Sequence, residues 1–173
     1  EKVSLASLPG MFQRTITVNG FAKGFAMTGW RVGYICAPEW IAKGSAKIQG
    51  QITSANCSIS QRAALTAITS DLSPTFDMAR QYLERRNMVY ELLKAIPGIK
   101  ANLPDGAFYF FPDVSSYFGK SDGEHTILEK AHVSLVSGAA FGNPDCVRLS
   151  YAASEENLKV AIKRISEVLA KFR

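Results

Sequence analysis

A lysine and an arginine, eight positions apart, are the side chains in this sequence best suited to chemistry. Lys23 lies among small and aromatic residues, and burial among such neighbours disfavours the ammonium form. We therefore expect a neutral, nucleophilic amine at Lys23 of the kind that forms Schiff bases with aldehydes. Arg31 lies between glycines, where a planar guanidinium can approach a phosphate closely. Together the two side chains predict a segment that binds pyridoxal phosphate, a cofactor with both an aldehyde and a phosphate.

The segment from Gly20 to Gly33 resembles the lysine signature of the class I/II aminotransferases, which are fold type I pyridoxal-phosphate enzymes. All constrained positions of the signature are met in the run Gly20-Phe21-Ala22-Lys23-Gly24-Phe25-Ala26-Met27-Thr28-Gly29-Trp30-Arg31-Val32-Gly33. The run is most similar to that of the bacterial aspartate aminotransferases, although Gly20 replaces a serine found in some members. The resemblance implies that Lys23 carries pyridoxal 5'-phosphate as a Schiff base and moves the substrate proton, and that Arg31 binds the cofactor phosphate. The competing interpretation is a glycine-rich connection whose lysine and arginine are only solvated.

Arg148 is the candidate for a substrate site. It lies on a predicted strand with its side chain on the face opposite Val147 and Leu149. Residue types alone leave two interpretations: Arg148 pairs with an internal carboxylate, or it offers its donors to a ligand carboxylate. The run Val147-Arg148-Leu149-Ser150-Tyr151-Ala152 resembles the family segment whose arginine binds the substrate α-carboxylate, which implies that role for Arg148.

Two further segments resemble parts of the small domain that line the substrate side in this family. They cover residues 104–109 and 137–142. Their aromatic residues Phe108, Tyr109 and Phe141 are open to two interpretations, as ordinary core residues or as contacts at the site.

Composition and charge exclude several other kinds of protein. A chain of 173 residues with 47% hydrophobic and 20% charged residues is typical of a soluble globular protein. Its net charge of +5 is spread along the chain, so we expect an anionic cofactor and carboxylate substrates in place of nucleic acid.

Cys36, Cys57 and Cys146 give no disulfide framework, and we expect buried thiols of a reducing compartment. His125 and His132 lack nearby partners for a zinc site. No apolar run is long enough to span a membrane, so the prediction is a cytoplasmic protein without a metal or membrane partner.

Periodicity predicts strands that alternate with helices, which indicates an α/β fold. The expected strands cover 14–19, 32–36, 107–111, 133–136 and 147–151, and the expected helices begin near Glu39, at Ser58 with Gln61 in a capping box, at Pro74 and after the N-cap Ser154. With the resemblance, the fold becomes that of the PLP-transferases related to aspartate aminotransferase. Residues 1–75 are then the C-terminal part of the large cofactor-binding domain, 76–96 the connecting helix and 97–173 the small domain.

Family members have a long N-terminal portion before the lysine strand. That portion supplies a phosphate-binding glycine loop, an aromatic residue that stacks on the cofactor, an asparagine, a tyrosine, and an aspartate at the pyridine nitrogen. None of these can be assigned here, so we expect this chain to be a C-terminal portion that is inactive alone. The connection between Gly119 and Ile127 is also shorter than is usual in the family.

The resemblance implies a homodimeric aminotransferase that moves an amino group between an L-amino acid, expected to be aspartate, and a 2-oxo acid, expected to be 2-oxoglutarate. An aromatic, prephenate or alanine aminotransferase would share nearly all of these residues. A carbon–sulfur lyase or a synthase of the same fold is a second possibility. A non-catalytic folded fragment or interaction domain is a third.

Overall fold

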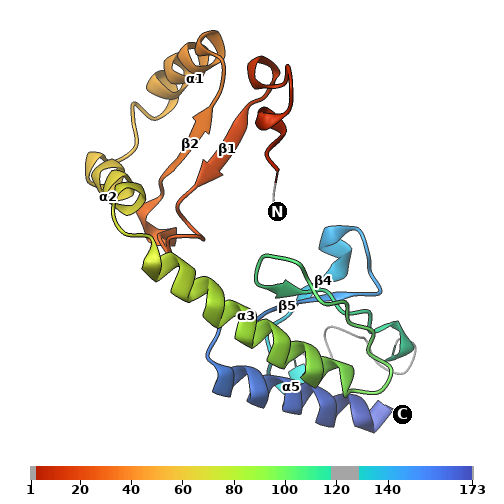
Figure 1. Cartoon of the computed structure of the whole chain (residues 1–173). Coiled ribbons are helices and arrows are strands. Elements are labelled where there is room, and N and C mark those ends of the chain that lie inside the picture. Colours follow the sequence, from red (N-terminus) through yellow and green to blue (C-terminus); the bar gives the residue numbers. More distant parts are fainter. Residues whose placement is uncertain (1–2, 118–128, 173) are drawn as a thin grey trace. The chain divides into compact units, whose positions relative to one another are not determined.

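The computed structural model describes residues 3–117 and 129–172, and the chain divides into two compact units, Glu1–Phe76 and Asp77–Arg173 (Figure 1). The first unit contains the strands β1 and β2 and the helices α1 and α2, and the second contains β3, β4, β5 and α5. Helix α3, Ser73–Lys94, begins in the first unit and runs through the second. The shortened connection at 119–127, together with His125, lies outside the described residues.

The first unit is built on an antiparallel pair of strands, β1 (Thr17–Gly20) and β2 (Gly33–Cys36), in which Gly20 lies opposite Gly33. The predicted strand at 14–19 begins later than expected. A 3-10 helix covers Phe12–Arg14, and the Thr15 hydroxyl donates a hydrogen bond of 2.8 Å to the Met11 carbonyl oxygen. These contacts tie the start of the predicted strand into a turn.

Two helices follow the strand pair. Helix α1 covers Glu39–Ile52, starting at Glu39 as predicted, and α2 covers Ser58–Thr69. The predicted capping box at Ser58 is wrong, because Cys57 is the N-cap residue and makes no side-chain cap bond. The Gln61 side-chain amide donates instead to the carbonyl oxygen of Asn56, at 3.1 Å.

The apolar stripe of α1 is exposed in this chain. Trp40, Ile48 and Ile52 are 76%, 62% and 73% exposed. The buried cluster of the first unit consists of Phe21, Met27 and Ala64, with a few half-buried neighbours. A two-stranded ladder offers too little surface to cover such a helix.

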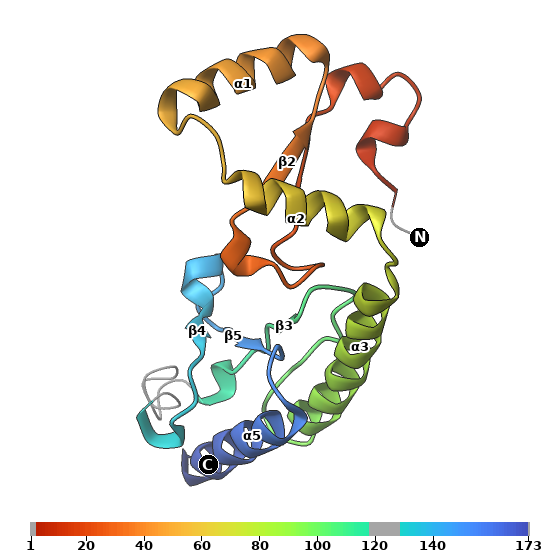
Figure 2. The same ribbon diagram turned by 90° about the vertical axis from the view of Figure 1, so that its left-hand side faces the viewer.

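The second unit packs two helices against a small antiparallel sheet. Helix α5 covers Glu155–Leu169, and α3 and α5 run side by side in both views (Figures 1 and 2). The sheet has the order β3-β5-β4, with β3 at Tyr109–Phe110, β5 at Val147–Ser150 and β4 at Val136–Ser137. Strand β3 is shorter than the strand predicted at 107–111, and β4 is shorter than the strand predicted at 133–136 and shifted toward the C-terminus.

Left-handed residues explain where those strands begin. Ala107 has φ of 60° and His132 has φ of 53°, so the backbone leaves the extended conformation at both positions. The predicted strand at 107–111 therefore pairs only from Tyr109, and the one predicted at 133–136 pairs only from Val136.

The core of the second unit joins both helices to the sheet. Buried members come from α3, β3, β5 and α5 and include Val89, Leu93, Phe110, Val147, Leu149, Leu158, Ile162, Ile165, Val168 and Leu169. The predicted N-cap of α5 is confirmed, because the Ser154 hydroxyl accepts a hydrogen bond of 3.3 Å from the amide of Asn157. Such an N-cap stabilises the folded protein by about 1 kcal/mol.

All three cysteines are free thiols, but only Cys146 is buried. The expectation of buried thiols is therefore wrong for Cys36 and Cys57, which are exposed because the first unit has so small a core. Within 3–117 and 129–172, no helix combines the length and the apolar character needed to cross a bilayer. In the same residues, no three His, Cys, Asp or Glu side chains gather as a metal site would require.

Candidate functional site

Lys23 and Arg31 lie on the loop that joins β1 to β2. The loop closes directly above the strands, where the Phe21 amide donates a hydrogen bond of 3.3 Å to the Val32 carbonyl oxygen. The amides of Phe25 and Met27 both donate to the Phe21 carbonyl oxygen at 3.3 Å. Phe21 and Met27 are buried against α2, so the base of the loop is anchored in the core of the first unit.

The paired glycines below the loop allow the two strands to come close together. A Cβ atom at Gly33 would lie 3.0 Å from the Asn19 carbonyl oxygen, and one at Gly20 would lie 3.5 Å from the Val32 carbonyl oxygen. A side chain at Gly33 would therefore push the strands apart. Glycine at position 33 thus has a structural reason that is independent of any ligand, whereas a Cβ atom at Gly20 would make only ordinary van der Waals contact.

The Lys23 side chain is exposed in the described structure. The expectation that it is packed among small and aromatic neighbours is therefore wrong for this chain. The Phe21 ring turns into the core instead, where its centroid lies 5.3 Å from that of Phe25 and 5.7 Å from that of Tyr34. The Lys23 carbonyl oxygen accepts a hydrogen bond of 3.1 Å from the Ala26 amide, which fixes the backbone at this position.

Arg31 is also exposed, and its backbone is left-handed, with φ of 52°. Ala26, in the same loop, has φ of 53°. Two residues with side chains in this sparsely populated conformation make a strained loop, as is often found at ligand sites. The Arg31 Nη1 atom donates a hydrogen bond of 2.9 Å to the Thr28 carbonyl oxygen, which orients the guanidinium and leaves its other N–H donors for a ligand.

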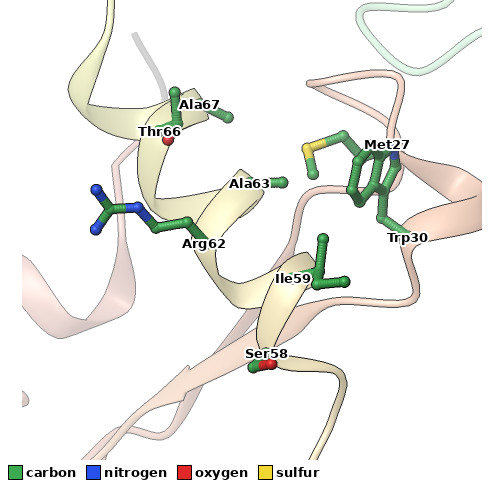
Figure 3. A pocket seen from close by; sticks show the side chains of 8 residues that line it. All are labelled: Met27, Trp30, Ser58, Ile59, Arg62, Ala63, Thr66 and Ala67. Carbon is green, nitrogen blue, oxygen red and sulfur yellow. The ribbon is translucent and has the colours of Figure 1, made fainter.

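A hollow of about 690 Å³ lies between this loop and α2. Its lining comprises Met27, Trp30, Ser58, Ile59, Arg62, Ala63, Thr66 and Ala67. Figure 3 shows the Arg62 guanidinium turned away from Met27 and Trp30, so the wall near the loop is apolar. Neither Lys23 nor Arg31 lines the hollow, and it is not the site that the sequence predicts.

Arg148 lies on β5 in the second unit and is half-buried. Its Cζ atom lies 4.5 Å from the ring centroid of Tyr109 and 4.4 Å from that of Phe141. Among the residues that the structure describes, its guanidinium makes no ion pair with a carboxylate. Of the two interpretations of Arg148, the described residues favour the one in which its donors serve a ligand.

The donor groups present fit pyridoxal phosphate. The loop between β1 and β2 carries a primary amine for an aldehyde and a guanidinium for a phosphate. Sequence reasoning found both residues through their spacing. It did not find the contacts of Tyr109 and Phe141 with Arg148, although the strand alternation of 109 and 111 was a usable signal for the face on which Tyr109 lies.

Comparison with known proteins assigns the family. The sequence profile described as "Aminotransferase class I and II" matches residues 4–165. This chain belongs to that family, and over the part that it covers it has the fold of the aspartate and aromatic aminotransferases.

Individual relatives are similar over almost all of this chain. The aspartate aminotransferase of Pinus pinaster is 46% identical, with 98% of this chain and 37% of the relative aligned. The bifunctional aspartate aminotransferase and glutamate/aspartate-prephenate aminotransferase of Petunia hybrida is 45% identical, over 98% of this chain and 38% of the relative. The crystal structure of an aromatic aminotransferase from Pyrococcus horikoshii OT3 has a TM-score of 0.93 and 38% identity, over 99% of this chain and 47% of that chain. The chain thus spans less than half the length of each of these relatives.

Proposed function

We propose that the protein containing this chain is a pyridoxal-phosphate-dependent aminotransferase that moves an amino group between L-aspartate and 2-oxoglutarate. The observation that carries the proposal is the hydrogen-bonded loop between β1 and β2, which holds the Lys23 amine and the Arg31 guanidinium in one short segment. Family membership supports the reaction class, and relatives named aspartate aminotransferase support the substrate. In this proposal, residues 1–75 belong to the large cofactor-binding domain and residues 97–173 form the small domain. Residues 76–96 form the helix that connects the two domains.

Lys23 and Arg31 hold the cofactor. The Lys23 amine would hold the aldehyde group as an imine, with loss of water, and the Arg31 donors that Thr28 does not use would bind phosphate oxygens. Pyridoxal 5'-phosphate, when bound, supplies an electron sink that makes the α-hydrogen of an amino acid acidic. The Lys23 amine would accept that proton as general base and return it as general acid.

Arg148 binds the substrate through its α-carboxylate. An arginine presents a planar fork of N–H donors that matches the two oxygens of a carboxylate. The absence of an ion pair at Arg148 among the described residues supports this role, because a protein carboxylate would compete with the substrate. Amino acids and 2-oxo acids share the carboxylate, so one arginine serves both halves of the reaction.

The exposure of Lys23 adds a requirement to the proposal. The residues that the structure describes leave the Lys23 side chain exposed, whereas an amine that holds a cofactor benefits from an enclosed site. The relatives extend well beyond the aligned part, and we propose that their remaining residues, together with the bound cofactor, supply that burial. On this basis we also propose that the 173 residues are inactive alone.

The test is borohydride reduction of the full-length protein in the presence of pyridoxal phosphate, followed by peptide mapping. Reduction fixes the cofactor to the amine that binds it, and the expected adduct is on Lys23. The variant Lys23→Ala should lose the adduct, whereas Lys43→Ala should keep it. Lys43 is a suitable control because it is exposed and paired with Glu39, at 2.6 Å. An adduct on any lysine other than Lys23 would overturn the assignment.

The reaction class has its own assay. An aminotransferase passes the amino group of L-aspartate to 2-oxoglutarate and forms glutamate, whereas a lyase of the same fold eliminates from its substrate and forms none. Glutamate formed in stoichiometric amounts with oxaloacetate supports the proposal. Turnover of phenylalanine or prephenate in preference to aspartate would replace the proposed substrate and keep the reaction class.

We further propose a cytoplasmic homodimer. Closed two-fold dimers are the commonest soluble oligomers, and the exposed apolar residues of the first unit leave ample surface for other parts of such an assembly. Sedimentation equilibrium of the full-length protein should give twice the subunit mass. A monomer in that measurement would contradict the proposal.

A further inference from the structure

Two aromatic rings hold Arg148 where a carboxylate could have been expected. The Cζ atom lies over the Tyr109 ring at 4.5 Å and over the Phe141 ring at 4.4 Å from each centroid. Three other arginines among the described residues, Arg31, Arg80 and Arg86, donate to protein oxygens. Arg86 donates to the Pro104 carbonyl oxygen at 3.1 Å. No such bond is found for the Arg148 side chain within 3–117 and 129–172.

The pairing of β3 with β5 brings the first ring to Arg148. Tyr109 lies directly opposite Ser150 in the ladder, and Arg148 is two residues before Ser150 on the same face. Diagonal neighbours on one face of an antiparallel pair are within reach of aromatic and long side chains. Tyr109 thus contacts Arg148 from the sheet itself.

A turn next to β4 brings the second ring. A 3-10 helix, Gly138–Phe141, follows the strand directly, and Val136 of β4 lies opposite Arg148. The Gly138 amide donates a hydrogen bond of 2.8 Å to the Cys146 carbonyl oxygen, which fixes the start of the turn. Phe141 is 49% exposed, so burial in the core does not account for its position. Among the described residues, its ring lies against Arg148 and against Phe111, whose ring centroid is 6.1 Å away.

Rings hold a guanidinium in a way that suits a ligand site. The negative face of an aromatic ring attracts the cation without accepting its N–H bonds, so those donors remain for a carboxylate. A long side chain that is already held loses less freedom when the ligand binds. An internal carboxylate would also hold Arg148, but it would occupy the donors.

We propose that Tyr109 and Phe141 are positioning residues that hold the Arg148 guanidinium ready for the substrate carboxylate. This inference rests on the proposed function, in which Arg148 binds that carboxylate. It predicts that the rings affect the affinity for both substrates, since each carries the carboxylate. It also predicts that they do not affect the chemical step, because neither ring takes part in proton transfer.

Ring deletion and ring retention test the inference in the full-length protein, by steady-state kinetics with L-aspartate and 2-oxoglutarate. Tyr109→Leu and Phe141→Leu should each raise both KM values about fivefold, the size of a cation–π contact at a partly exposed site, with kcat within about twofold. Tyr109→Phe and Phe141→Tyr keep a ring and should keep both KM values. Rescue by these variants, together with the separation of KM from kcat, would not result from a merely structural role.

Phe172→Leu is the matched control. It removes the ring that lies under Lys130, at 4.7 Å, a comparable contact of the same unit that does not involve Arg148. Its KM values should stay within about twofold of the parent protein. If this control raises KM as much as Phe141→Leu does, the effect is general and the inference is wrong.

Arg148→Ala separates the inference from the proposed function. If Arg148→Ala raises both KM values and the ring deletions do not, the inference fails and the proposed function stands. If Arg148→Ala leaves both KM values unchanged, the proposed role of Arg148 fails, and the inference fails with it. Increases in both sets of variants, reversed where a ring is kept, support both statements.

Discussion

The Tyr151 hydroxyl donates a hydrogen bond of 2.9 Å to the Ala107 carbonyl oxygen. Tyr151 is 2% exposed, and Ala107 has the left-handed φ of 60° that precedes β3. The bond therefore joins the end of β5 to the residue at which the backbone turns toward Tyr109. The buried Tyr151 side chain thereby supports β3, whose residue Tyr109 contacts Arg148.

Tyr151→Phe removes this bond and little else. We expect a loss of about 1 kcal/mol in the free energy of unfolding, the usual contribution of one hydrogen bond. Urea unfolding of the full-length protein, followed by a probe in the second unit, measures it. Tyr90→Phe is the matched control, because the Tyr90 hydroxyl makes no hydrogen bond with the described residues. An equal loss in both variants would contradict the prediction.

Alkaline pH should destabilise the second unit. Burial raises the pKa of the Cys146 thiol, with help from the nearby charges of Asp113 and Asp145, and burial raises the pKa of Tyr151. A raised pKa means that the folded state holds its proton more tightly than the unfolded state, so stability is full below the ordinary thiol pKa and falls above it. Unfolding free energies measured from pH 8 to 11 should decrease.

Cys146→Ala should make that decrease begin at higher pH, because only the tyrosine contribution then remains. Cys57→Ala should leave the decrease in place. Cys57 is exposed, and the nearby backbone N–H groups of Ser60 and Ile59 lower its pKa, so its effect has the opposite sign. The same alkaline slope in Cys146→Ala and in the parent protein would exclude the thiol as a cause.

Local signals predicted the elements that depend on nearby residues. The strands predicted at 14–19 and 32–36 come within one residue of the end of β1 and the start of β2, and the start of α5 follows from the Ser154 cap. The strands beside Ala107 and His132 were misjudged, because a left-handed residue other than glycine leaves no mark in a hydrophobic pattern.

The sequence predicted which residues form the candidate site, but it did not predict how those residues are packed. Residue types and the family signature identified Lys23 and Arg31, and the resemblance of residues 147–152 to a family segment identified Arg148. The burial of Lys23 depends on packing by distant parts of a chain, and the residues within 3–117 and 129–172 do not supply it. The Tyr109 ring reaches Arg148 through the register of β3 with β5, and the Phe141 ring through the turn after β4; a hydrophobic pattern indicates neither.

Leu93→Ala should show how strongly the second unit depends on its core. Leu93 is 1% exposed and belongs to the cluster that joins α3 to α5. Removing its side chain leaves a cavity, and we expect a loss of about 2–5 kcal/mol in urea unfolding. Leu83→Ala, at a position on the same helix that is 47% exposed, should cost less than about 1 kcal/mol. Similar losses in both variants would mean that α3 does not pack as described.

Gly138→Ala tests the turn that carries Phe141. A Cβ atom at Gly138 would collide with the carbonyl oxygens of Asn143 and Cys146, which are backbone atoms that cannot turn aside. We expect a loss of about 3 kcal/mol in the free energy of unfolding, at the upper end for an overpacked site. Because the turn also places the Phe141 ring, both KM values should rise as in Phe141→Leu.

Gly44→Ala is the control for this substitution. Gly44 lies within α1, and a Cβ atom there would meet nothing within 4 Å. Alanine in a helix is better than glycine by about 0.5–1 kcal/mol, so this variant should be slightly more stable than the parent protein. A Gly138→Ala protein as stable as Gly44→Ala would show that the turn can open without cost, and it could then not hold Phe141 against Arg148.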